Sequence, residues 1–184
     1  GQLPIQYHVL APELLLSQGQ ALLETGQPVQ AASILQQAEA GFQAQTDLFG
    51  QIRAKLLQGW TYHAHGKYSD GLQLAHELLP QLNAVQEPLL TAEALRLIGA
   101  NYYGRGDWTA AEQPLEQALV IYRRAPADNR RAFSLGRTLE DLANVLRTTG
   151  RLEEAATLQA EALTLWRQIG NPGPLARCLN NLGY

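Results

Sequence analysis

The side chains that most often carry catalysis or bind metals are few in this sequence, and they match no known motif. Of the four histidines, His63 and His65 lie close in sequence, but residues two apart on a helix point about 200° away from each other and cannot share a metal ion. No HExxH, paired CxxC or GxxxxGK[ST] pattern occurs. The single cysteine, Cys178, excludes an internal disulfide, and packing within a helix explains it. We therefore predict no enzyme, no cofactor and no metal site.

The charges argue against nucleic acid as a direct partner. The net charge of the 184 residues is −3, whereas nucleic-acid binding needs a basic surface. Adjacent acidic pairs, Glu140-Asp141 and Glu153-Glu154, are explained by solvated helix faces or helix starts. No apolar run approaches the ~18 residues of a membrane span, and one cysteine is compatible with a reducing cytosol. We expect a cytoplasmic protein that makes no membrane contact.

The segment 95–125 shows how the chain is organised, because it contains two amphipathic helices and a tight turn. Apolar residues recur at i, i+3 and i+7 from Leu95, and Gly104 and Gly106 then end the first helix. Asp107 is placed to accept hydrogen bonds from the free N–H groups of the next helix. The apolar or small stripe of the second helix consists of Trp108, Ala111, Leu115, Ala118, Leu119 and Tyr122. This pattern predicts an antiparallel helix pair.

The same pattern recurs along the chain. The turn glycines Gly26, Gly66, Gly106 and Gly150 follow one another at intervals of 40, 40 and 44 residues. A small residue such as Gly99 lies seven positions before each, so that two helices can approach closely. A period in this range predicts stacked helical repeats in one domain. We expect repeats at about 12–46, 47–86, 87–128 and 129–171, and a half repeat at 172–184.

The expected helix ends follow from proline and glycine. We expect Pro12 in the first turn of the first helix, with residues 1–11 as an extended lead-in or the remnant of a preceding helix. Asp47 should begin the third helix. The run 170–174, GNPGP, should separate the last pair from a closing helix that starts at Leu175.

This order of apolar residue, small residue, turn glycine, aromatic residue and small residue resembles the tetratricopeptide repeat (TPR), best in Leu95–Tyr122 and Leu139–Trp166. In the earlier repeats, Gln18, Lys55 and Gln58 occupy positions that are apolar later. The period exceeds the ~34 residues of the standard repeat. Such long repeats look like the sensor arms of bacterial signalling ATPases and of maltose-regulator-like transcription activators. The resemblance implies an all-α, right-handed α-solenoid of four antiparallel helix pairs plus a closing helix. Because the chain begins with glycine and contains no methionine, we expect it to be a fragment of a larger protein.

The resemblance also implies that the first helix of each pair lines an inner groove. A stripe at i, i+3, i+7 and i+10 on these helices carries five arginines against three glutamates, Glu13, Glu93 and Glu140. Arginine with aromatic and amide side chains suits peptide recognition, and a solvated helix face is the alternative. We expect solvent-accessible side chains that point into one concave surface at Trp60, Tyr103, Arg96, Arg137, Asn144 and Arg147. The predicted groove residues are Arg53, Trp60, His63, Arg96, Tyr103, Arg137, Asn144, Arg147, Arg177 and Asn180.

Three functions remain open at this point. The first is a module that binds a protein or peptide segment within a larger regulatory protein that acts in signalling or transcription regulation. The second is an arm that senses a small effector and controls an attached ATPase or DNA-binding domain. The third is a structural spacer or an oligomerisation arm that self-associates through its terminal helices.

Overall fold

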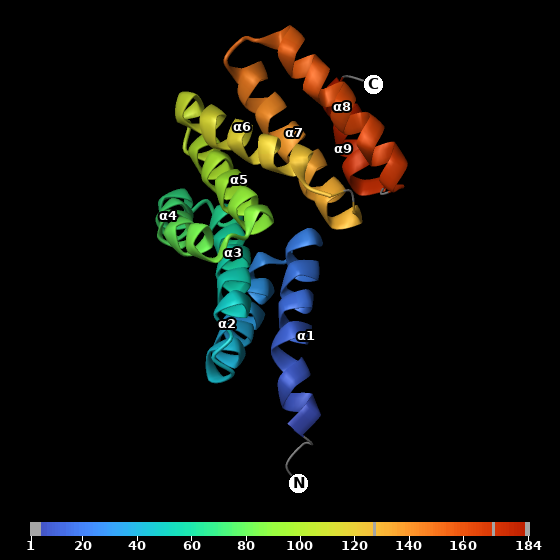
Figure 1. Cartoon of the computed structure of the whole chain (residues 1–184). Coiled ribbons are helices and arrows are strands. Elements are labelled where there is room, and N and C mark those ends of the chain that lie inside the picture. Colours follow the sequence, from blue (N-terminus) through green and yellow to red (C-terminus); the bar gives the residue numbers. More distant parts are fainter. Residues whose placement is uncertain (1–4, 127, 171, 183–184) are drawn as a thin grey trace. The chain divides into compact units, whose positions relative to one another are not determined.

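The computed structural model describes residues 5–126, 128–170 and 172–182, and these form helices joined by short turns (Figure 1). The predicted all-α fold of antiparallel helix pairs is confirmed in the described residues. Residues 183–184 of the expected half repeat lie outside them. The helices are α1 (Ile5–Glu24), α2 (Pro28–Ala44), α3 (Leu48–Ala64), α4 (Tyr68–Val85), α5 (Pro88–Gly104), α6 (Trp108–Arg124), α7 (Asn129–Thr148), α8 (Leu152–Ile169) and α9 (Pro172–Leu182).

The chain divides into two compact units, residues 1–78 and 79–184, and each is described by itself. In unit 1, α2 packs against both α1 and α3, and α1 also contacts α3. Leu16, Leu35 and Phe42 are buried in its core. A Cβ atom added to Gly19 would lie 2.5 Å from Cδ2 of Leu35, so a glycine lets α1 and α2 approach.

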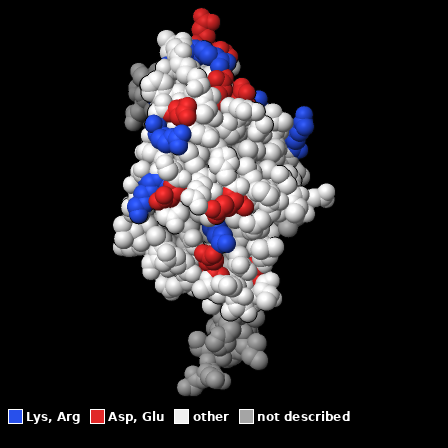
Figure 2. Space-filling view, turned by 90° about the vertical axis from the view of Figure 1, so that its left-hand side faces the viewer, with Lys and Arg blue, Asp and Glu red and all other residues white. Residues whose placement is uncertain are grey.

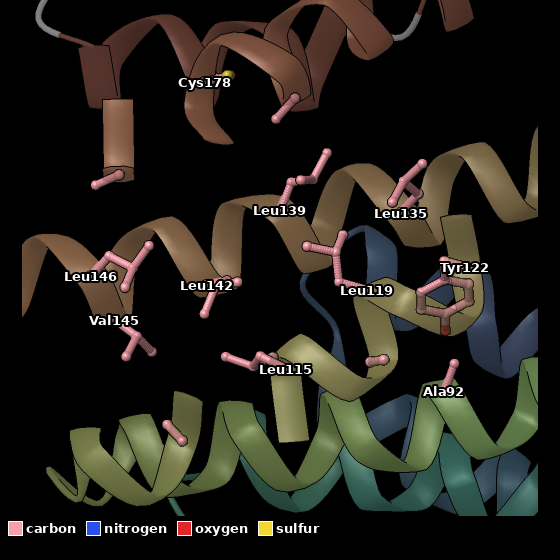
Figure 3. Packing of buried hydrophobic residues seen from close by; sticks show 14 of the residues in the cluster. Ala92, Leu115, Leu119, Tyr122, Leu135, Leu139, Leu142, Val145, Leu146 and Cys178 are labelled. Atoms are coloured by element: carbon pink, nitrogen blue, oxygen red, sulfur yellow. The ribbon is translucent and has the colours of Figure 1, made fainter. Parts of the chain in front are cut away.

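In unit 2, each helix from α5 to α9 packs against the next one, and α5 also contacts α7. Figure 3 shows the leucines along α7 close to Leu115, Leu119 and Tyr122 of α6. As predicted, Gly99 is buried at a close helix contact: a Cβ atom added there would lie 2.4 Å from Cγ of Leu115. The close packing of α5 against α6 therefore requires glycine at position 99.

The turns follow the predicted glycines. Gly26, Gly66, Gly106 and Gly150 have φ angles of +73°, +71°, +85° and +84°, in the left-handed region that favours glycine. Asp47 begins α3 as expected, and its side chain accepts a hydrogen bond of 2.9 Å from the Gly50 amide.

Two expected helix starts and one expected cap are wrong. Helix α1 begins at Ile5, so Pro12 lies inside it. The Pro12 side chain lies where a side chain at Gly41 would otherwise be. The Asp107 side chain makes no capping hydrogen bond to the start of α6, and instead accepts a hydrogen bond from Arg105 at 3.4 Å. Helix α9 begins at Pro172, because proline is compatible with a first helical turn. Residue 171 and residues 1–4 lie outside the described residues.

The polar residues in the apolar positions of α3 have a partner on α2. Gln58 donates to Oε2 of Glu39 at 2.8 Å, and Nζ of Lys55 lies 3.6 Å from Oε1 of the same carboxylate. Glu39 thus binds both of the polar residues that depart from the repeat pattern in α3. The contact between α2 and α3 therefore includes polar side chains.

Candidate binding face

The first helices of the pairs in unit 2 are joined side by side through polar side chains. Arg96 of α5 binds Asp141 of α7 at 3.2 Å, and the Tyr103 hydroxyl lies 3.4 Å from Thr148 Oγ1. Helix α9 joins α7 through Arg177. We call this surface the α5–α7–α9 face, and define it as Glu93, Arg96, Tyr103, Arg137, Glu140, Asp141, Asn144, Arg147, Thr148 and Arg177.

Arg96 is buried in the contact between the helices and is not accessible to a ligand. Its Nη2 donates to Glu93 at 2.9 Å, and Glu93 also accepts a hydrogen bond of 2.9 Å from the Tyr122 hydroxyl. Burial acts to lower the pKa of Arg96, but Glu93 and Asp141 more than offset it and the pKa is raised. Arg96 is 7% exposed, so the expectation that it is solvent-accessible is wrong.

Glu140 is also structural, although the sequence assigns the Glu140-Asp141 pair to a solvated face. It is 3% exposed, and its Oε2 accepts a hydrogen bond of 2.6 Å from Nη2 of Arg177. Burial raises the pKa of Glu140, while the bond to Arg177 acts to lower it. The other oxygen, Oε1, has no hydrogen-bond partner among the described residues. Both acidic residues thus belong to ion pairs between helices, which corrects the sequence interpretation.

Arg137 differs from these arginines because it makes no hydrogen bond or ion pair with any described residue. It lies half-buried on α7. Burial lowers the pKa of Arg137, and the nearby charges of Arg96 and Arg177 lower it further. A guanidinium nevertheless stays protonated in proteins. The carboxylates of Asp141 and Glu140 act to raise the pKa of Arg137, but neither lies within ion-pair distance of its guanidinium.

The end of α7 carries a second set of polar groups with spare bonding capacity. The exposed Arg147 donates from Nη2 to Oδ1 of Asn144 at 3.3 Å. No described residue accepts from the Asn144 amide nitrogen. Both side chains border a hollow of about 190 Å³ whose remaining lining is Ala143, Leu152, Ala155, Ala156 and Gln159.

The positive charge of the predicted stripe is explained by this pairing. Each of its three glutamates binds one of its arginines: Glu13 binds Arg53, Glu93 binds Arg96 and Glu140 binds Arg177. The two arginines that remain are Arg137 and Arg147. Figure 2 shows the same tendency on the side that it presents, where blue and red side chains mostly touch.

The predicted residues of unit 1 form their own contacts. Arg53 binds Glu13 at 2.7 Å, and its guanidinium lies 5.7 Å from the Phe49 ring centroid. The Trp60 and His63 rings meet edge to face with centroids 5.5 Å apart. Trp60 and Tyr103 are both half-buried. In unit 1 the structure thus brings Trp60 and His63 together, while Arg53 binds other residues. The six predicted residues of unit 2 whose side chains are described lie on α5, α7 and α9, and the Asn180 side chain lies outside the described ones.

Sequence reasoning missed Asp141, Thr148 and Tyr122 as members of the polar network. Asp141 lies one residue beyond the stripe, and Thr148 lies one residue after Arg147. A signal was present, since Arg96 and Asp141, like Tyr103 and Thr148, are 45 residues apart, close to the repeat spacing of 44. A search for complementary side chains one repeat apart would have found both pairs.

The described residues contain neither a metal-binding cluster nor a membrane-spanning helix. They hold no group of three or more His, Cys, Asp or Glu side chains that could bind a metal ion. None of the described helices is both long and apolar enough to cross a membrane.

Comparison with known proteins identifies the repeat type in part of the chain. Residues 91–125 and 135–169, which cover most of α5–α6 and α7–α8, match the tetratricopeptide repeat. A search of curated proteins found no match.

Several solved structures share the fold at low sequence identity. A Rap protein complexed with Competence and Sporulation Factor has a TM-score of 0.73 and 14% identity, over 94% of this chain and 52% of that one. The apo form of RapI has a TM-score of 0.69 and 15% identity, over 93% and 46%. A kinesin light chain of TPR-like repeats from Podosopora anserina has a TM-score of 0.62 and 18% identity, over 96% and 88%.

The chain spans about half the length of the two Rap proteins. These likenesses concern the fold alone. The chain has a TPR-like helical-repeat fold, which is typical of protein-binding modules, and two of its helix pairs match the tetratricopeptide repeat itself.

Proposed function

We propose that this chain is a protein- or peptide-binding helical-repeat module, part of a larger regulatory protein, which holds an extended segment on the α5–α7–α9 face. The observation that carries the proposal is the set of unused donors along α7. Arg137 has no partner among the described residues, and Asn144 and Arg147 bind only each other through their side chains. None of the Arg137 nitrogens is among the fully buried polar atoms that lack a partner, so these donors are accessible to an external ligand. The Rap protein of the same fold was solved with a bound factor, which supports this reading.

A peptide fits this face better than a small effector does. Pockets for small molecules usually enclose about 300–1,000 Å³, whereas the hollow beside Asn144 is about 190 Å³. The unused donors are also spread along α7 over ten residues, or roughly 15 Å at 1.5 Å per residue. An extended chain can reach such spaced groups at once. A spacer, in contrast, does not require several donors without partners along one helix.

A steric block on this face tests the proposal without relying on charge. Short peptides are selected from a displayed random library on the wild-type chain, and their Kd values are measured by fluorescence anisotropy. Asn144→Cys is then labelled with a bulky maleimide. The native Cys178 is fully buried, so the new thiol reacts selectively. We expect the label to weaken binding by about tenfold or more.

The matched control is Gln117→Cys with the same label, because Gln117 is exposed on α6, a second helix. This variant should bind the peptides as the wild type does. Failure to select any peptide would leave the spacer as the better interpretation. Equal binding by both labelled variants would place the peptide site on another surface.

A further inference from the structure

The arrangement of charges on α7 explains why Arg137 lacks a partner. An arginine on a helix usually pairs with an acidic residue three or four positions away. For Arg137 these positions hold Glu140 and Asp141, but Glu140 binds Arg177 of α9 and Asp141 binds Arg96 of α5. Both local carboxylates are therefore used to hold neighbouring helices. The guanidinium between them is left with its donors unused.

Charges of both signs surround Arg137, and the carboxylates of Asp141 and Glu140 act to raise its pKa. Arg96 and Arg177 lie close enough to lower the pKa of Arg137, in addition to the effect of burial. Arg177 donates to Glu140 through Nη2, and its side chain is 45% exposed. An arriving anion would relieve the repulsion at Arg137. A planar carboxylate suits it best, because guanidinium and carboxylate match in two parallel hydrogen bonds.

Arg147 is the second arginine of this face that has no ion pair with a described residue, and its distance from Arg137 determines how far apart the binding groups of the ligand must be. Arg147 lies ten residues after Arg137, about 15 Å along the helix axis, and Asn144 lies between them with its amide nitrogen unused. An extended peptide advances roughly 3.3 Å per residue. Two groups on such a peptide that reach both arginines are therefore about four or five residues apart.

We propose that the ligand of the α5–α7–α9 face is an extended peptide with two carboxylates four or five residues apart, one bound by Arg137 and the other by Arg147. Asn144 donates a hydrogen bond to a peptide carbonyl between them. Either carboxylate is an acidic side chain or the C-terminal carboxylate of the peptide. This inference rests on the proposed function and adds the chemistry of the bound segment.

The test uses the peptides selected on the wild-type chain. Each is resynthesised with single Asp→Asn or Glu→Gln changes, and with an amidated C-terminus, so that side-chain and terminal carboxylates are distinguished. Removal of either anchoring carboxylate should weaken binding to the wild type by about tenfold. Arg137→Gln should weaken binding of the parent peptide to a similar degree, and removal of its carboxylate should then have little further effect. Arg147→Gln provides a second, exposed site for the same comparison.

The control is Arg124→Gln, which removes the same charge from an exposed arginine that has no described partner, on the second helix α6. Circular dichroism checks that each variant is folded. Equal weakening by Arg124→Gln and Arg137→Gln would mean that only net charge matters, and would overturn the inference. Selected peptides without paired acids would also overturn it, yet leave the proposed function standing. If no peptide is selected, both fall together.

Discussion

Nη1 of Arg96 donates to Oδ2 of Asp141 at 3.2 Å, which joins α5 to α7 across 45 residues of sequence. Arg96 also binds Glu93, whose second oxygen accepts from Tyr122 of α6. One buried guanidinium thereby connects three helices of two successive pairs. A buried ion pair need not add stability in itself, but removing one partner leaves the others unpaired. The cost of breaking this network therefore measures how firmly the pairs are joined.

Arg96→Gln should lower the free energy of unfolding by about 2–4 kcal/mol, because Glu93 and Asp141 lose their ion pairs with a buried guanidinium, while Glu93 keeps its hydrogen bond from Tyr122. Urea denaturation followed by circular dichroism measures this change. Arg123→Gln is the matched control, since Arg123 pairs with Glu161 on an exposed surface, where an ion pair contributes about 0–1 kcal/mol. Equal stability of the two variants would contradict a joining role for Arg96.

Gly99→Ala should destabilise the chain by about 1–3 kcal/mol, although alanine favours a helix by about 1 kcal/mol. The added Cβ atom would lie 2.4 Å from Cγ of Leu115 and 3.1 Å from the Ala111 carbonyl oxygen. Neither atom is the free end of a flexible side chain, so the helices must separate slightly. Gly99→Leu should be worse. The midpoint of thermal unfolding gives the ranking.

Two controls separate this steric effect from backbone conformation. Combining Gly99→Ala with Leu115→Ala should cost less than the sum of the single changes, because the second removes the clash. Gly106→Ala tests the other use of glycine: nothing lies within 4 Å of an added Cβ, but φ is +85°. Its cost, about 1 kcal/mol, should not depend on the residue at position 115. Additivity in the first pair would show that Gly99 is not in close contact with Leu115.

The positions of turns and close helix contacts could be predicted from the sequence, because each is fixed by a local requirement. A positive φ requires glycine at Gly106, and a close contact requires a small residue at Gly99. These requirements recur with the repeat and are visible without knowing which helices meet. The exceptions involve proline, since Pro12 and Pro172 are compatible with more than one position in a helix.

The candidate site could be predicted only as a set of residues on one stripe. Which charge pairs with which depends on how neighbouring helices are placed, and this is not local information. The stripe treats Arg96 and Arg137 as equivalent, yet Asp141, one residue outside it, binds Arg96 and leaves Arg137 unpaired. The distinction arises from packing between pairs, so it required the structure.

Glu140 should make stability depend on pH. Its pKa is raised by burial above the value of about 4.3 expected for an unfolded chain, so the folded state holds this proton more tightly. That contribution to stability is fully present below the unfolded pKa and is lost as the pH rises through the folded pKa. The unfolding free energy of the wild type, measured relative to Glu140→Gln in urea titrations, should therefore fall from acidic to neutral pH. A constant or rising difference would contradict the burial of this carboxylate.

Arg137→Met should stabilise the folded chain while abolishing its binding of acidic peptides. The wild-type guanidinium is half-buried without an ion-pair partner among the described residues. Its pKa is lowered because burial and the repulsion by Arg96 and Arg177 outweigh the attraction by Asp141 and Glu140, and an apolar side chain of similar length removes this unfavourable balance. Such replacements commonly gain about 0.5–2 kcal/mol. The gain should be larger at low salt, where the repulsion between the arginines is least screened. Arg124→Met, on an exposed part of α6, should change stability by less than about 0.5 kcal/mol at any salt concentration. Urea denaturation at low and high sodium chloride, with anisotropy for peptide binding, measures both effects. A loss of stability on Arg137→Met would show that Arg137 supports the fold, and the main reason for assigning it to a ligand would be gone.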